Sequence, residues 1–169
     1  MRIYLIGYMG SGKSTLGREL ASRLNLSFLD MDQFIEERYL KTVPDIFREE
    51  GEIRFREKEQ ACLREISVME DVVVATGGGA PCFFDNMEFM NLTGCCVFLD
   101  VEPGELVIRL KRGDVIRPLI QEKPAEELVQ TIEEMMRRRR PFYEKARYII
   151  SGNSITADDV INKIGMNCG

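Results

Sequence analysis

Apolar residues along the chain follow two different spacings. Short runs rich in apolar and β-branched residues, which predict strands, alternate with longer segments of helical period, which predict helices. The predicted strands are residues 3–6, 27–30, 72–75, 96–99 and 148–150. The predicted helices are residues 13–24, 31–39, 44–49, 53–67, 103–111, 124–143 and 157–164. This alternation is typical of βα units, and strands that are apolar on both faces indicate a parallel α/β sheet covered by helices on both sides.

A glycine-rich segment joins the first predicted strand to the first predicted helix. Residues 7–14 read Gly-Tyr-Met-Gly-Ser-Gly-Lys-Ser, which satisfies the phosphate-loop pattern GxxxxGK[ST] in the context that this pattern requires. Glycines let backbone N–H groups face phosphate oxygens, and the helix N-terminus adds a partial positive charge. We expect Lys13 to reach the β- and γ-phosphates of ATP and the Ser14 hydroxyl to complete a Mg²⁺ shell.

Two carboxylates stand at the end of the second predicted strand, in Leu29-Asp30-Met31-Asp32. Ligands bind at the carboxyl ends of strands in open α/β sheets, so Asp30 and Asp32 are candidates for Mg²⁺ binding and for accepting a substrate proton. Helix capping by either residue is the alternative interpretation.

Three consecutive glycines, Gly77, Gly78 and Gly79, follow the third predicted strand. They indicate close approach of the backbone to a substrate, or else only a tight turn. Arg56 and Glu59 lie one helical turn apart and could pair, leaving the guanidinium oriented toward an anion. A solvated helix face is the alternative for this pair.

The stretch between Lys111 and Pro124 is polar, carries a glycine and a proline, and interrupts the regular alternation. It is typical of a mobile loop over a site. Arg117 in this loop, and Arg139 just before Pro141, are candidate clamps for a carboxylate or a phosphate. Exposure to solvent is the alternative for both arginines.

Composition narrows the class of protein. A chain of 169 residues, 44% hydrophobic and 30% charged, fits one globular domain, residues 1–169. The first residues lead directly into a strand and no apolar run reaches about 18 residues, so we expect a cytoplasmic protein without a membrane span. The net charge of −5 disfavours nucleic acid as a partner.

Histidine is absent, so a general base must be Asp, Glu, Lys, Tyr or Cys. The five cysteines contain no CxxC pair, which disfavours a zinc site or a disulfide framework. We interpret the adjacent Cys95 and Cys96 as small hydrophobic residues of a buried strand.

Taken together in this order and spacing, the motifs resemble those of the shikimate kinase family over essentially the whole chain. The matching segments are GxxGxGKST at 7–15, the DxD pair at 30 and 32, IFxxxGExxFRxxE at 46–59, the triple glycine at 77–79, RPL at 117–119 and RxPxY at 139–143.

The resemblance implies a three-layer P-loop kinase fold, with a five-stranded parallel sheet in the order 2-3-1-4-5. It also implies a substrate-binding helical region at about 31–60 and a lid at about 111–124. The expected chemistry is transfer of phosphate from ATP, with Mg²⁺, to the 3-hydroxyl of shikimate on the route to chorismate and the aromatic amino acids. We expect a monomer.

The same resemblance assigns roles to individual residues. Arg56 and Arg139 would clasp the shikimate carboxylate, with Asp32, Gly78 and Gly79 completing the substrate site. Asp30 and Ser14 would organise Mg²⁺. The nucleotide would contact Gly10, Ser11, Gly12, Lys13, Ser14, Thr15, Arg117 and Asn153. Lys13, Asp32 and Arg117 would be catalytic.

The sequence departs from the family pattern near the last strand. Where the family commonly places an arginine against adenine, residues 151–156 read Ser-Gly-Asn-Ser-Ile-Thr, with no arginine. The lid stretch is about one residue shorter than the family pattern, which leaves open whether Lys111 or Arg112 faces the nucleotide.

Two alternatives to shikimate kinase remain at this point. One is another small-molecule P-loop kinase, of the gluconate or nucleoside-monophosphate type. The other is a catalytically silent nucleotide-binding homologue.

Overall fold

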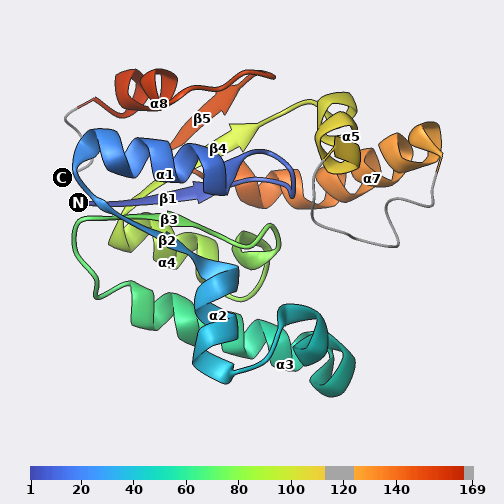
Figure 1. Cartoon of the computed structure of the whole chain (residues 1–169), viewed down its shortest axis with the longest axis horizontal. Helices are drawn as coiled ribbons and strands as arrows, with labels where there is room; N and C mark the ends of the chain where they lie inside the picture. Colours follow the sequence, from blue (N-terminus) through green and yellow to red (C-terminus); the bar gives the residue numbers. More distant parts are fainter. Residues whose placement is uncertain (113–123, 166–169) are drawn as a thin grey trace.

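The computed structural model describes residues 1–112 and 124–165. In this part of the chain, five parallel strands form one sheet in the order β2-β3-β1-β4-β5 (Figure 1). The strands are β1 (Arg2–Ile6), β2 (Ser27–Asp30), β3 (Val72–Ala75), β4 (Cys95–Asp100) and β5 (Tyr148–Ser151). The predicted sheet order is confirmed.

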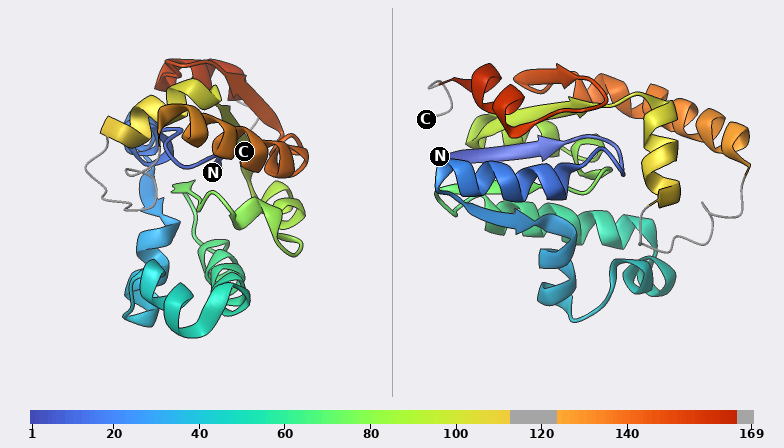
Figure 2. Two further views of the ribbon diagram at one scale, coloured as in Figure 1. Left: turned by 90° about the vertical axis from the view of Figure 1, so that its right-hand side faces the viewer. Right: turned by 45° about the horizontal axis from the view of Figure 1, so that its top comes forward.

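Helices cover both faces of this sheet (Figure 2). Helices α1 (Lys13–Leu24) and α8 (Ala157–Ile164) share a hydrophobic cluster with one face. The cluster on the other face includes α2 (Met31–Tyr39), α3 (Val43–Ile66), α4 (Asn86–Thr93), α5 (Pro103–Arg112) and α7 (Ala125–Tyr143). The three layers predicted from the resemblance are therefore present.

Residues of the central strands alternate between the two clusters, which explains why these strands are mainly apolar. In β1, Ile3 and Leu5 face α1 and α8, whereas Tyr4 and Ile6 belong to the opposite cluster. All four side chains are fully buried. A strand buried on both faces has no position at which a polar side chain would reach water.

The segment predicted as two helices, 44–49 and 53–67, forms the single element α3 with an internal break. Gly51 lies at φ 82° and ψ 171°, a backbone conformation that non-glycine residues rarely adopt. Helix α4 and the short 3₁₀ helix η1 (Ala80–Cys82) were not predicted. Helix α8 is equally short, but the Thr156 side chain caps its start, a signal that α4 lacks within the described residues.

Parallel pairing brings the carboxyl ends of all five strands to the same edge of the sheet. Directly after β3, Thr76 donates a backbone hydrogen bond to Leu5 O of β1 at 3.1 Å, so the loops that follow these two strands start next to each other at this edge. The helical pair α2 and α3 follows β2 and projects away from the sheet (Figure 1). The phosphate loop and the predicted substrate region thus both begin at this edge, after β1 and β2 respectively.

Two expectations from composition meet different outcomes. Cys96 is buried, and burial raises the pKa of its thiol to about 12, as expected for a small hydrophobic residue. Cys95 is buried as well, as expected, but it is disulfide-bonded, so the expectation that disfavoured disulfides is wrong at this position. Cysteine spacing along a sequence does not by itself reveal which cysteines pair.

Among the helices of residues 1–112 and 124–165, none combines the length and the apolar character that crossing a membrane requires.

A comparison of two glycines tests the packing of the β1–β4 junction. A Cβ at Gly94 would lie 2.8 Å from Arg2 O and 2.8 Å from the Tyr4 ring, whereas a Cβ at Gly104 would meet nothing within 4 Å. We expect Gly94→Ala to lower the free energy of unfolding by about 1–3 kcal/mol through overpacking. Gly104→Ala, the matched control, should be neutral or stabilising by up to about 1 kcal/mol. Urea unfolding measures both, and equal effects would contradict the packing argument.

Candidate active site

The glycine-rich loop between β1 and α1 has the geometry of an anion site. Gly10 lies at φ 80° and Gly12 at φ 92°, so the chain can turn its backbone toward one point. Helix α1 begins at Lys13, and within the described part of the chain no side chain caps its N-terminus. Backbone N–H groups at an uncapped helix start, with the positive end of the helix dipole, favour a phosphate.

Lys13 is folded into this loop. Its Nζ donates to Gly7 O at 2.9 Å and to Tyr8 O at 2.8 Å, and lies 3.5 Å from Ser11 Oγ. The side chain is only 9% exposed. The loop carbonyls therefore hold the ammonium group beside the phosphate-binding backbone.

Asp30 links the phosphate loop to the start of α2. One carboxylate oxygen accepts a 2.6 Å hydrogen bond from Ser14 Oγ, while the other accepts from the backbone N–H of Asp32 at 3.1 Å. The capping interpretation of Asp30 is therefore correct, and the same residue contacts Ser14, the other residue expected to organise Mg²⁺. Ser14 and Thr15 belong to the first turn of α1, so this hydrogen bond joins the start of α1 to the start of α2.

These residues fit a Mg²⁺ ion that also binds nucleotide phosphates. Within residues 1–112 and 124–165, no three His, Cys, Asp or Glu side chains gather as a protein-only metal cage. Magnesium commonly takes one or two protein oxygens together with substrate phosphates and water. Ser14 and Asp30 can supply that share directly or through water.

The triple glycine brings together four charged side chains from three elements. A Cβ at Gly77 would lie 2.9 Å from Asp32 Oδ1 and 2.9 Å from Glu59 Oε1. A Cβ at Gly79 would lie 2.5 Å from Arg56 Nη2, and one at Gly78 would lie 3.4 Å from Arg139 Nη1. None of the three glycines has a positive φ, so at Gly77 and Gly79 crowding, and not turn geometry, disfavours larger residues.

The same glycines touch the phosphate loop. A Cβ at Gly78 would also lie 3.4 Å from Gly7 O and 3.5 Å from Met9 N. The backbone O of Gly78 accepts a 2.5 Å hydrogen bond from the Tyr143 hydroxyl, and burial raises the pKa of that hydroxyl. The segment is thus fixed from α7 on one side and borders the phosphate loop on the other.

Arg56 is a buried cation, so the solvated-face interpretation of this part of α3 is wrong. The residue is 7% exposed, and its Nη1 donates to Glu59 Oε2 at 2.8 Å. Glu52 accepts from Nη2 at 3.3 Å. Glu59 and Glu52 accept hydrogen bonds from only some of the N–H groups of Arg56. These bonds fix the position of the guanidinium and leave its other N–H groups available.

Glu59 is 1% exposed, and burial is the largest influence on its carboxyl group. Burial raises the pKa of Glu59 to about 7, while the neighbouring Arg56 opposes the shift and Asp32 adds to it. The sequence drew attention to Glu59 only as a partner of Arg56, because the proximity of Asp32 depends on the tertiary fold.

Asn153 lies in the loop after β5, at the point where an arginine was expected and not found. Its Nδ2 donates to Glu102 at 2.8 Å, and its backbone O accepts from Arg109 Nη2 at 2.6 Å. Arg109 also donates to Ser11 O at 3.3 Å. An arginine from α5 therefore joins the phosphate loop to this segment, which no local sequence signal indicated because Arg109 and Ser11 are 98 residues apart.

Part of the predicted site lies outside the described residues. Arg117 and residues 113–123 of the predicted lid are in this category. Lys111 and Arg112 end α5 with exposed side chains.

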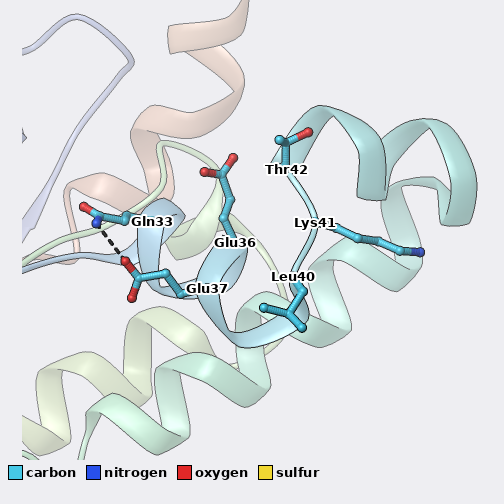
Figure 3. A pocket seen from close by; sticks show the side chains of 6 residues that line it. All are labelled: Gln33, Glu36, Glu37, Leu40, Lys41 and Thr42. Carbon is cyan, nitrogen blue, oxygen red and sulfur yellow. Dashed lines mark hydrogen bonds between the residues drawn. The ribbon is translucent and has the colours of Figure 1, made fainter.

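Two hollows in the surface do not coincide with this cluster. One, of about 390 Å³, lies between the end of α2 and the start of α3, where Gln33 donates to Glu37 and Lys41 points away from Glu36 (Figure 3). The other, of about 610 Å³, borders the predicted site only at Asn153. The convergence of charged side chains on backbone, rather than cavity size, therefore locates the candidate site.

A phosphate loop leading from β1 into α1, on a parallel sheet of this order, defines the chain as a P-loop phosphotransferase. Comparison with known proteins narrows this class. The sequence model of the family described as shikimate kinase matches residues 9–168. The chain belongs to the shikimate kinase family, and its enzyme class is that of kinases that use ATP with Mg²⁺.

Individual relatives agree with this assignment. The chain is 53% identical to a shikimate kinase of Phocaeicola vulgatus over 154 residues, covering 91% of this chain and 88% of the relative. The crystal structure of shikimate kinase from Bacteroides thetaiotaomicron matches with a TM-score of 0.90 at 46% identity, covering 96% and 94% of the two chains. Shikimate kinase from Acinetobacter baumannii in complex with shikimate matches with a TM-score of 0.82 at 41% identity, covering 96% and 89%.

The raised pKa of Glu59 predicts a specific pH dependence of stability. In the unfolded chain this carboxyl ionises near its ordinary value of 4.5, whereas the folded protein keeps the proton until about pH 7. Its contribution to stability is therefore complete below the unfolded pKa and is lost as pH rises through the folded pKa. We expect the melting temperature of the wild type, relative to Glu59→Gln, to fall between about pH 5 and pH 8. Parallel melting profiles for the two proteins would contradict the assignment.

Proposed function

We propose that this chain transfers the γ-phosphoryl group of ATP to the 3-hydroxyl of shikimate, using the residues described above. The observation that carries the residue assignment is the contact of Gly77–Gly79 with Asp32, Arg56 and Arg139 on one side and with the phosphate loop on the other. The acceptor and the phosphoryl donor would thus meet at one stretch of backbone. The relative from Acinetobacter baumannii that matches in structure was solved with shikimate.

Arg56 and Arg139 would hold the carboxylate of shikimate. Both guanidinium groups approach the triple glycine, at Gly79 and Gly78 respectively. Paired cations from two elements would fix the position of a carboxylate, and the close backbone would leave room only for a small acceptor. Gly78 and Gly79 would complete the wall of the substrate site.

Lys13 would move from the loop carbonyls to the β- and γ-phosphates. The backbone of residues 10–15 would bind the same phosphates, while Ser14 and Asp30 would hold Mg²⁺. When bound, Mg²⁺ supplies positive charge that neutralises the developing charge of the transferring group. Asn153 would contact the nucleotide base from a segment that Arg109 ties to the phosphate loop.

Asp32 would orient the acceptor hydroxyl and take its proton. Its Oδ1 lies at the Gly77 end of the triple glycine. An ordinary carboxylate is a weak base at neutral pH, but a loose transition state requires proton removal only late in the transfer. Arg117, outside the described residues, is assigned to the transferring phosphate by the family pattern alone.

We further propose that the protein acts in the cytoplasm as a monomer, as a single domain of residues 1–169 with a lid at 111–124. Its partner would be the small molecule shikimate, without nucleic acid or membrane. The product, shikimate 3-phosphate, would enter the route to chorismate and the aromatic amino acids. The two arginines beside the triple glycine, Arg56 and Arg139, favour an acid acceptor over a nucleoside monophosphate, although gluconate also carries a carboxylate.

A coupled assay of ADP release tests the acceptor. We expect turnover with shikimate and background rates with gluconate and CMP, because only shikimate combines the carboxylate and the ring hydroxyl at the required separation. Lys13→Ala is the control and should abolish turnover, since Asp30 and the loop carbonyls offer no replacement cation. Preferred turnover of gluconate or CMP, or a Lys13→Ala rate within about tenfold of wild type, would contradict the proposal.

Substitutions at Asp32 and Arg139 should affect different kinetic constants, kcat at Asp32 and the KM for shikimate at Arg139. We expect Asp32→Asn to lower kcat more than Arg139→Ala, because it removes the proposed proton acceptor. Arg139→Ala should act mainly on the KM for shikimate, raising it by about 10- to 150-fold, as the loss of a charged hydrogen bond predicts. Steady-state kinetics measure both effects. An unchanged KM in Arg139→Ala would show that this arginine does not bind the carboxylate.

A further inference from the structure

The face of the Arg56 guanidinium is covered by an aromatic ring that the proposed mechanism does not use. The Cζ atom of Arg56 lies 4.1 Å from the centroid of the Phe83 ring. Phe55 and Phe47 are more distant, at 5.1 Å and 5.8 Å. Cation–π attraction falls with distance, so Phe83 makes the closest of these three contacts.

Phe83 reaches Arg56 because the loop after η1 is tied to α3. Asp85 accepts hydrogen bonds from Gln60 Nε2 at 2.9 Å and from Arg64 Nη2 at 2.5 Å. Gln60 and Arg64 lie on the same helix as Arg56. The helix that carries the buried cation therefore also holds the chain on the far side of Phe83.

The backbone between these points adopts an unfavourable conformation. Phe83 is extended, at φ −120° and ψ 146°, whereas Phe84 lies at φ 51° in the left-handed region. A left-handed conformation is unfavourable for a bulky residue and persists only where the surroundings impose it. Phe84 turns its side chain outward, 56% exposed, while the preceding ring is directed onto Arg56.

The result restricts the orientation of the guanidinium. Glu59 and Glu52 accept hydrogen bonds that lie in its plane, Phe83 packs on its face, and the backbone of Gly79 lies against it. Carboxylates alone fix an edge but allow the plane to tilt about that edge. A ring on the face removes this freedom, and a bidentate hydrogen bond to a ligand carboxylate depends on the orientation of that plane.

We propose that Phe83 is a positioning residue for shikimate binding: it holds the plane of Arg56 in the orientation that receives the substrate carboxylate. This inference rests on the proposed carboxylate role of Arg56. Phe83 does not need to touch the substrate, and its effect should pass through Arg56 to acceptor binding and not to ATP.

The test compares two adjacent phenylalanines changed in the same way. We expect Phe83→Leu to raise the KM for shikimate by about 3- to 30-fold, the range that corresponds to a buried cation–π contact. Its kcat and its KM for ATP should stay within about twofold of wild type. Phe84→Leu, which removes an exposed ring, should leave all three constants unchanged. Phe83→Tyr, which keeps the ring face, should restore the KM to within about threefold of wild type.

A double-mutant cycle separates positioning from general loosening. In an Arg56→Ala background, Phe83→Leu should cause no further rise in the shikimate KM, because the residue on which it acts is absent. Unchanged shikimate KM in Phe83→Leu, additive effects with Arg56→Ala, or equal rises in the KM of both substrates would each overturn the inference. If Phe83→Leu does not fold, Phe83→Met takes its place in the same comparison.

Failure of this inference is distinguishable from failure of the proposed function. A normal shikimate KM in Arg56→Ala would refute the carboxylate role of that arginine, and with it the basis of the inference. A raised KM in Arg56→Ala together with a normal KM in Phe83→Leu would refute only the role of Phe83.

Discussion

The backbone of Gly77–Gly79 passes so close to charged side chains that a Cβ at Gly77 or Gly79 would come within 3.0 Å of one of them. Most of the site depends on this constraint. Because the segment carries no side chains, Asp32 from α2, Arg56 from α3 and Arg139 from α7 can all approach it. The same segment borders the phosphate loop through Gly7 and Met9. Elements that are distant in sequence therefore contact the same backbone segment, Gly77–Gly79. The position of this segment is set by β3, the strand that it follows.

The cost of this arrangement is a buried ionic cluster. Arg56 and Glu59 are both nearly inaccessible, and removing two charges from water is unfavourable unless each is well paired. Glu52 and the ring of Phe83 offset part of that cost by contacting the Arg56 guanidinium. The raised pKa of Glu59 offsets another part, because this carboxyl can be uncharged near neutral pH. Such clusters are weak sources of stability, which is consistent with a role in recognition of an anion.

Local motifs predicted a large part of the fold and of the phosphate site. The phosphate loop is contiguous in sequence, so its geometry could be predicted from residues 7–14 alone. Strands that are buried on both faces could be predicted from their runs of apolar residues. Features that depend on distant pairs were not predictable. Nothing near Arg109 indicates that it would join Ser11 to Asn153, and nothing near Phe83 indicates the cation beneath it. Asp30 shows an intermediate case: helix capping and Mg²⁺ binding looked like alternatives because the sequence does not show that one carboxylate oxygen accepts from the backbone of α2 while the other accepts from Ser14.

The hydrogen bond between Ser14 and Asp30 fixes a direction as well as a contact. A hydroxyl has one hydrogen and two lone pairs, and an ionised carboxylate can only accept, so the hydrogen of Ser14 is committed to Asp30. Both lone pairs of the Ser14 oxygen are then left to face elsewhere, and the negative partner increases the electron density on that oxygen. Asp30, at the end of β2, thus keeps the Ser14 hydroxyl from donating a hydrogen bond to the nucleotide. The Ser14 oxygen is left with its lone pairs available, which is the arrangement that a cation requires.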